Sequence, residues 1–255
     1  MSLRAKVLNS YGNIDNILVT NSFKRFYSNV SVGYTGKEYY ILLDKTKIIT
    51  PLNNILSHSS VKLIQEIASE WSAQSEIIKI DSMPLTKLLF TAIDKVKPNI
   101  DNTILSLISA FETDFIIYQA DHPLGIADKQ KELFQPILLW IYDKYNIKPQ
   151  INKSLYPLDN KSNVKFKLKE LLDSFDFIEL TSLQSLTNSI NSLILAIAFL
   201  KKNINIKLLM ECIYLEENWR IKITGDVDYL LEEKKILHFV INSIERFYDL
   251  KNNKE

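Results

Sequence analysis

Residues 66–86 read EIASEWSAQSEIIKIDSMPLT, and two helical patterns meet in this stretch across a short link. The first pattern has apolar residues at helical spacing: Ile64, Ile67, Ala68 and Trp71. After the link comes Pro84, a residue typical of the first turn of a helix. The second pattern is an apolar stripe formed by Leu85, Leu88, Leu89, Ala92, Ile93 and Val96. We expect Pro98 to end this second helix, because proline lacks the backbone donor that a helix interior needs.

The segment before this stretch is typical of strands. Residues 29–51 read NVSVGYTGKEYYILLDKTKIITP, in which β-branched and aromatic residues form short runs separated by glycines and Asp44. This pattern predicts a hairpin or three-stranded meander over about residues 29–50. Pro51 should end the last strand, because it cannot donate a hydrogen bond to a sheet.

The chain after Pro98 is predicted to be helical. Asp101 is expected to cap a helix that runs to about residue 120, and another helix is expected over residues 127–146. Pro136 lies inside this second helix and should kink or break it. Four further helices are predicted over about residues 162–176, 180–202, 205–223 and 228–249.

These patterns predict an α+β fold, in which a small domain of antiparallel strands with helices precedes an all-helical domain. The predicted parts are an N-terminal extension (1–24), the small α+β domain (25–97), the helical bundle domain (98–250) and a disordered tail (251–255).

The composition is that of an ordinary soluble globular protein, with 255 residues, 46% hydrophobic and 24% charged side chains and a formal net charge of +1. This charge balance gives no overall field that would attract nucleic acid or an acidic membrane. The longest apolar run, residues 193–200, is shorter than the roughly 20 residues of a membrane-spanning helix, so we expect no stable membrane insertion. Cys212 is the single cysteine, and residues 1–16 lack the apolar core of a secretory signal. Together these features predict a soluble intracellular protein.

The sequence contains no familiar catalytic or cofactor-binding motif. Its glycines are too sparse for a phosphate-binding loop, and in GYTGKEYY (33–40) Glu38 stands where Ser or Thr would hold magnesium. His58, His122 and His238 are isolated from one another. We therefore expect no catalytic residue, no metal and no cofactor.

Paired carboxylates are the remaining route to hydrolysis. The candidates beside apolar helices are Glu70, Asp94, Glu112, Asp114, Glu216 and Glu217. Acid pairs also arise by chance, and Glu216 can form an ordinary surface pair with Arg220 one turn later. A carboxylate-dependent hydrolase is therefore the less favoured alternative.

Seven stretches occur in the order found in one known family. They are RFYSNVSV (25–32), YYILLDKTKIITP (39–51), IASEWSAQSEIIKIDSMPLTKLLFTAIDKV (67–96), TDFIIYQADHP (113–123), KQKELFQPILLW (129–140), NSLILAIAF (191–199) and YLEENWRIKITGDVDY (214–229). Through them the chain resembles the mitochondrial and alphaproteobacterial assembly chaperones that bind the alpha subunit of the F-type ATP synthase head. The resemblance covers about residues 25–230. The chain departs from the family at Gln119, where the family has arginine, and at Arg220 and Thr224, where it has glutamine and tryptophan.

The resemblance implies an α+β front domain joined to an orthogonal helical bundle. It also implies a chaperone that binds the free alpha subunit without hydrolysing nucleotide. We expect a monomer in the bacterial cytoplasm, or in the mitochondrial matrix if the source is eukaryotic. The main alternative is a helical protein-interaction module with another client.

We expect a structural joint formed by Glu70, Trp71, Gln74, Pro84 and Asp94. Trp71 should lie in the core against the helix that follows Pro84, while Glu70 and Gln74 lie on a neighbouring face. Hydrogen bonds from Glu70 and Gln74 to the link would then fix the angle between the domains.

We expect the partner-binding surface on the late helix that carries Glu216, Glu217, Trp219 and Arg220. The resemblance maps the family's functional acid to Glu216, which would meet a basic or polar group on the client. The alternative is that Glu216 and Arg220 form a solvated pair and that Trp219 is buried.

Overall fold

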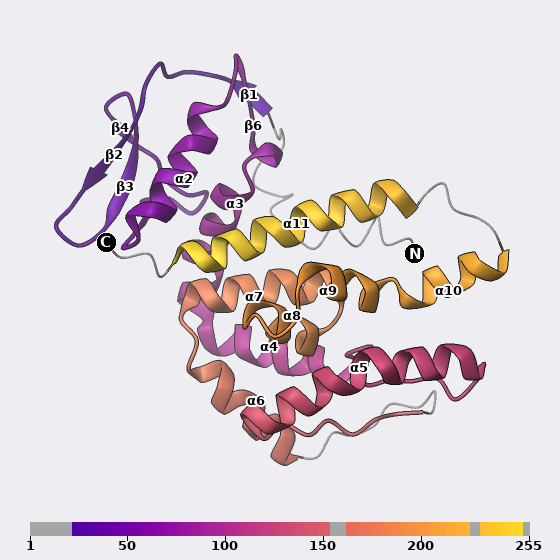
Figure 1. The fold of residues 1–255 in the computed structure, drawn as a ribbon. Helices are drawn as coiled ribbons and strands as arrows, with labels where there is room; N and C mark the ends of the chain where they lie inside the picture. Colours follow the sequence, from indigo (N-terminus) through magenta and orange to yellow (C-terminus); the bar gives the residue numbers. More distant parts are fainter. Residues whose placement is uncertain (1–21, 154–161, 225–229, 252–255) are drawn as a thin grey trace. The chain divides into compact units, whose positions relative to one another are not determined.

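The computed structural model describes residues 22–153, 162–224 and 230–251, which divide into two compact units (Figure 1). Of these residues, the front unit contains 22–100, 176–182 and 242–251, and the helical unit contains the others. The division falls within α4 (Ile100–Glu112), α7 (Phe177–Ile190) and α11 (Leu230–Leu250). The predicted extension up to residue 21 and the predicted tail from residue 252 lie outside the described residues.

Two antiparallel sheets belong to the front unit. The first contains β2 (Val30–Tyr34), β3 (Tyr39–Leu43), β4 (Thr46–Lys47) and β5 (Ser57–His58). Its first three strands confirm the predicted meander, with Val32 opposite Ile41. The second sheet pairs β1 (Ser22–Lys24) with β6 (Ile77–Lys79). Strand β6 lies in the segment that was predicted only as a link, and β1 lies at the end of the predicted N-terminal extension. Ile41 and Leu43 are buried on β3, because alternate side chains of a strand share a face.

The predicted first helix is α2 (Val61–Ser72), which contacts β2, β3 and α3 (Figure 1). Ser60 caps it, since the Ser60 hydroxyl accepts a hydrogen bond from the Leu63 amide at 3.3 Å. The buried face of α2 carries Leu63, Ile64, Ile67, Ala68 and Trp71, which confirms the predicted apolar stripe.

Helical backbone continues past Pro98, so the prediction that this proline ends the helix is wrong. After α3 (Pro84–Thr91) come the π-helical η2 (Ala92–Val96), the 3₁₀ segment η3 (Lys97–Asn99) and α4 (Ile100–Glu112). The backbone changes helix type before Pro98, which then lies in the first turn of η3, where a helix does not need the proline amide. Asp101 lies in the first turn of α4 and does not precede the helix as predicted.

Several helices of the helical unit are shorter than the sequence pattern suggested. The remaining ones are α5 (Leu124–Tyr145), α6 (Ser162–Asp173), α8 (Leu193–Leu200), α9 (Ile206–Ile213) and α10 (Leu215–Thr224). The predicted helix over 180–202 is interrupted by Asn191, whose φ of 55° is left-handed, and Ser192 then caps α8. Likewise α4 ends at Glu112. Pro136 was predicted to kink or break its helix, and α5 runs through this residue without a break.

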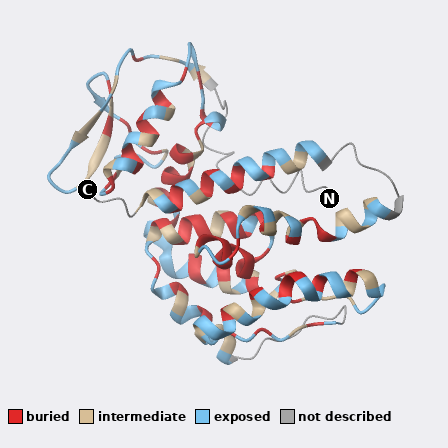
Figure 2. Cartoon of the chain, viewed as in Figure 1, coloured by how far each residue is buried: buried red, intermediate tan, exposed pale blue. Residues whose placement is uncertain are grey.

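All eight residues of α8 are buried, which makes this helix the centre of the helical unit (Figure 2). A helix that is apolar on every side must be covered on every side. Accordingly, α8 contacts α5 and α9. Among the helices in the described part of the chain, none combines the length and hydropathy needed to cross a membrane.

Candidate partner-binding site

Within the predicted joint, Glu70 caps the N-terminus of α3. Its Oε1 accepts a hydrogen bond from the Leu85 amide at 2.8 Å, and its Oε2 accepts bonds from the Thr86 amide at 2.8 Å and hydroxyl at 2.7 Å. Pro84 occupies the first turn and has no amide to satisfy. Burial raises the pKa of Glu70, and these hydrogen bonds act in the opposite direction. Glu70 therefore joins α2 to α3.

Gln74 holds the link between the same two helices. Its Nε2 donates to the Glu70 carbonyl at 3.1 Å and to the Ser82 hydroxyl at 3.2 Å, and its Oε1 accepts from the Lys79 amide at 2.9 Å. The Arg25 guanidinium donates to the Gln74 carbonyl. All these groups belong to the front unit. A role in setting the angle between domains stays a prediction.

Trp71 is only 4% exposed, which confirms its expected place in the core. Its carbonyl accepts a hydrogen bond from the Tyr27 hydroxyl at 2.7 Å, and the two ring centroids lie 6.0 Å apart. Trp71 thus packs inside the front unit.

Asp94 binds a different segment from Glu70 and Gln74. Its carboxylate accepts hydrogen bonds from the Thr50 hydroxyl at 2.6 Å, the Leu52 amide at 2.9 Å and the Asn54 side chain at 2.8 Å. These three donors span the loop after β4. Asp94 therefore fixes that loop.

On the predicted partner-binding helix, α10, Glu216 is exposed and hydrogen-bonded to α5. Gln130 of α5 is 2% exposed, and its Nε2 donates to Glu216 Oε1 at 3.3 Å. The other end of the same amide, Oε1, accepts a hydrogen bond from the Ala120 backbone amide at 2.7 Å. Because a backbone amide can only donate, this contact fixes which end of the Gln130 amide faces Glu216. Gln130 therefore orients the Glu216 carboxylate.

Trp219 is half-buried. This exposure is intermediate between that expected for a partner-contact residue and that expected for a core residue. Its indole packs on Gly125 in the first turn of α5, where an added β-carbon would overlap the ring. Glycine at this position therefore allows α10 to approach α5 closely. Arg220 is exposed one turn after Glu216.

A pocket of about 440 Å³ opens beside the start of α10. Glu216 and Glu217 line it together with Thr113, Phe115, Phe134, Ser189, Ile190, Asn191, Cys212, Ile213 and Leu215. The structure thus brings two of the four predicted contact residues to one pocket, while Trp219 packs against α5. No signal in the sequence indicates this pocket, because its walls come from four separate segments.

Cys212 is the one thiol among the described residues that line this pocket. Burial raises the pKa of the Cys212 thiol to about 12, so the thiol stays protonated near neutral pH. Over residues 22–153, 162–224 and 230–251, no three His, Cys, Asp or Glu side chains gather as a metal site would require.

Asp114, one of the carboxylates noted in the sequence, is fully buried at the N-terminus of α8. Its carboxylate accepts hydrogen bonds from the Ile194 amide at 2.9 Å and the Ile116 amide at 3.3 Å. Burial raises the pKa of Asp114 from 3.8 to about 6, against the opposing effect of these bonds. Asp114 thus connects the turn after α4 to the central helix.

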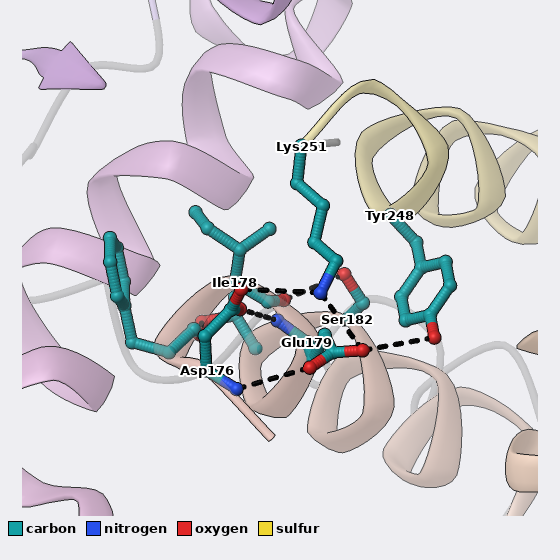
Figure 3. Close-up of polar contacts among 8 residues, drawn as sticks. Asp176, Ile178, Glu179, Ser182, Tyr248 and Lys251 are labelled. Atoms are coloured by element: carbon teal, nitrogen blue, oxygen red, sulfur yellow. Dashed lines mark hydrogen bonds and ion pairs between the residues drawn. The ribbon is translucent and has the colours of Figure 1, made fainter. Parts of the chain in front are cut away.

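A polar cluster at the N-terminus of α7 was not anticipated from the sequence (Figure 3). The Asp176 and Glu179 side chains each accept a hydrogen bond from the other's backbone amide, at 2.8 and 3.1 Å, which is a capping box. The Lys251 ammonium lies 2.9 Å from Glu179 and 3.2 Å from Asp176. Figure 3 also shows the Tyr248 hydroxyl donating to Glu179, at 3.1 Å. The Asp-x-x-Glu spacing was the signal that could have revealed this cap.

Comparison with known proteins finds a family resemblance over part of the chain. The profile of the family described as ATP12 chaperone protein matches residues 24–142. Residues 24–142 carry the signature of the ATP12 chaperone family. This match confirms the resemblance predicted from the sequence.

Solved structures of other proteins share the fold of this chain. Atp12 from Paracoccus denitrificans aligns with a TM-score of 0.83 and 27% identity, over 90% of this chain and 98% of that chain. A point mutant of the same Atp12 aligns with the same values. The Atu1473 protein from Agrobacterium tumefaciens aligns with a TM-score of 0.83 and 22% identity, over 97% of this chain and 95% of that chain. The α+β fold class is thereby confirmed.

Proposed function

We propose that this chain is an ATP-independent assembly chaperone that binds the unassembled alpha subunit of the F-type ATP synthase. The ATP12 family match and the likeness to solved Atp12 structures support the chaperone role. The choice of the alpha subunit rests on the resemblance of the sequence motifs. The chaperone would act in the bacterial cytoplasm, or in the matrix of a mitochondrion.

A free ring subunit exposes apolar surface that its neighbours cover in the assembled ring, and such surface promotes aggregation. The chaperone covers this surface until the correct neighbour displaces it. Displacement by mass action needs no nucleotide hydrolysis.

The helical unit offers apolar surface suited to this task along α5. Leu124, Leu139 and Tyr142 are 66%, 52% and 41% exposed, and they line a groove of about 570 Å³. Lys131 and Lys148 lie on the same groove. Apolar contact would supply affinity here, while charged groups limit self-association.

The observation that carries the proposal for the contact site is the Glu216 carboxylate. It is exposed on α10 and held by a buried glutamine. An exposed acid that is held in place loses little entropy on meeting a cation, which favours its use in recognition.

Replacing Glu216 with Lys tests this site. We expect the variant to fold normally and to lose capture of the alpha subunit, because the reversed charge repels the cation that Glu216 meets. Glu211→Lys is the matched control, since Glu211 is exposed on the neighbouring helix α9. Pull-down of purified alpha subunit measures the result, and equal capture by wild type and Glu216→Lys would remove Glu216 from the binding surface.

A further inference from the structure

The pocket beside α10 combines apolar walls with an acidic edge. Phe115 and Phe134 meet edge to face in its wall, with ring centroids 5.9 Å apart. Glu216 and Glu217 supply its charge, and none of the described residues that line it is basic. Such a pocket is matched in charge to a ligand with a cationic end and an apolar body.

The electrostatic balance of this pocket stays negative when the helix dipole is included. The pocket adjoins the N-terminus of α10, where backbone amides contribute about half a positive charge. The first turn of α10 holds two carboxylate side chains, which outweigh this partial positive charge. An anionic ligand is therefore disfavoured.

The hydrogen bond from Gln130 occupies one oxygen of the Glu216 carboxylate and leaves the other oxygen for a partner. Gln130 donates a hydrogen bond to Oε1 of Glu216. Within the described part of the chain, no second hydrogen bond to this carboxylate is found. Oε2 thus keeps lone pairs available for an incoming donor. The fixed orientation favours a planar donor over a compact one, because guanidinium bonds to carboxylates with directional N–H groups.

We propose that this pocket receives one arginine side chain of the chaperoned alpha subunit. Its guanidinium pairs with Glu216, and its methylene stem packs along the wall that contains Phe115 and Phe134. The pocket volume, about 440 Å³, lies within the range of about 300–1,000 Å³ typical of ligand sites and accommodates one long side chain with water. This inference rests on the proposed function, and it names the group on the client that Glu216 recognises.

Two variants test insertion and charge separately. Thr113 is exposed and lines the pocket, so Thr113→Trp should fill it from the rim without disturbing the core. Glu216→Gln removes the charge and keeps the side-chain volume. We expect each to weaken binding of the alpha subunit by roughly ten- to hundred-fold, in line with the loss of a charge-assisted hydrogen bond. Thr113→Ser and Glu211→Gln are the matched controls and should bind as wild type does.

The role of Gln130 is tested by a double-mutant cycle. Gln130→Met keeps the volume but removes the donor to Glu216. If Gln130 acts through Glu216, adding Gln130→Met to Glu216→Gln should weaken binding no further. Equal additional losses in both backgrounds would show a general structural effect and overturn the positioning role.

The client arginine is identified by replacing the arginines of the alpha subunit with glutamine, one at a time. Biolayer interferometry with wild type and Glu216→Gln should reveal one arginine whose loss is non-additive with the loss of Glu216. A lysine that behaves so in a parallel scan would overturn the choice of arginine.

The outcomes separate this inference from the proposed function. If wild type binds the alpha subunit and Thr113→Trp binds equally well, the pocket is not entered and the inference fails while the proposed function stands. If wild type itself does not bind the alpha subunit, the proposed function fails. Thermal unfolding of every variant, compared with wild type, shows that the folded proteins are being measured.

Discussion

Replacing Asp114 with Asn is expected to remove a specific pH dependence from the stability of the helical unit. Asp114 is fully buried, and burial raises the pKa of its carboxyl from 3.8 to about 6. The ionised side chain accepts hydrogen bonds from the Ile194 amide of α8 and from the Ile116 amide in the turn after α4, but these do not fully offset the loss of water. The folded protein therefore holds a proton on Asp114 more tightly than the unfolded chain does.

The sign and size follow from linkage between protonation and folding. Between about pH 4 and pH 6 the folded state binds more proton than the unfolded state, so the free energy of unfolding decreases as pH rises. A pKa increase from 3.8 to about 6 corresponds to about 3 kcal/mol in total, at about 1.36 kcal/mol for each pH unit. About 2 kcal/mol of this change falls between pH 4 and pH 7. An acid with a lowered pKa would give the opposite slope.

Urea denaturation measures this change in wild type and Asp114→Asn across pH 4 to 7. Other carboxyl groups titrate in both proteins, so the free energy of unfolding of the variant is subtracted from that of wild type at each pH. We expect this difference to decrease by about 2 kcal/mol as pH rises. Asp101→Asn, at an exposed position in the first turn of α4, is the control for replacing an aspartate that is not buried. Parallel curves for wild type and Asp114→Asn, or a difference that increases with pH, would refute the reasoning.

Two other substitutions probe the joint and the contact between α5 and α10. Glu70→Gln should lower the free energy of unfolding by about 1–2 kcal/mol in chemical denaturation, because it replaces the carboxylate cap of α3 with an amide. Glu76→Gln, at an exposed position, is the control and should change this free energy by less than about 0.5 kcal/mol. Equal effects of the two substitutions would contradict the capping role of Glu70. Gly125→Ala should displace the Trp219 indole, shift tryptophan fluorescence to longer wavelength and cost about 1 kcal/mol, because the methyl group overlaps the ring. Adding Trp219→Leu should abolish both effects, and an unshifted spectrum in Gly125→Ala would argue against the contact.

The helix faces and the front strands could be predicted because their signals are local. The stripe that ends at Trp71 has the period of a helix, and the runs before Pro51 have the composition of strands. The break at Asn191 was missed although it lies in the polar stretch NSINS (188–192), in which asparagine is typical of a left-handed helix end and serine of a helix start. Pro98 misled the prediction because the backbone changes helix type just before it.

The site was predicted only in part. Position on the late helix and the family resemblance indicated Glu216, but its partner Gln130 is separated from it by 86 residues in the chain. Such a contact, like the pocket beside it, follows from how α5 and α10 pack. The cap formed by Asp176 and Glu179 was within reach of the sequence, since its spacing alone predicts it.

The most direct test of the account is the solubility of isolated alpha subunit of the F-type ATP synthase mixed with this chain in the absence of nucleotide. Light scattering during dilution from denaturant, followed by size-exclusion chromatography, reports aggregation and complex formation together. We predict that the wild-type chain suppresses scattering at about equimolar ratio and elutes with the alpha subunit, whereas Glu216→Lys does neither. Scattering that wild type leaves unchanged, or a complex that forms only when ATP is added and hydrolysed, would contradict the account.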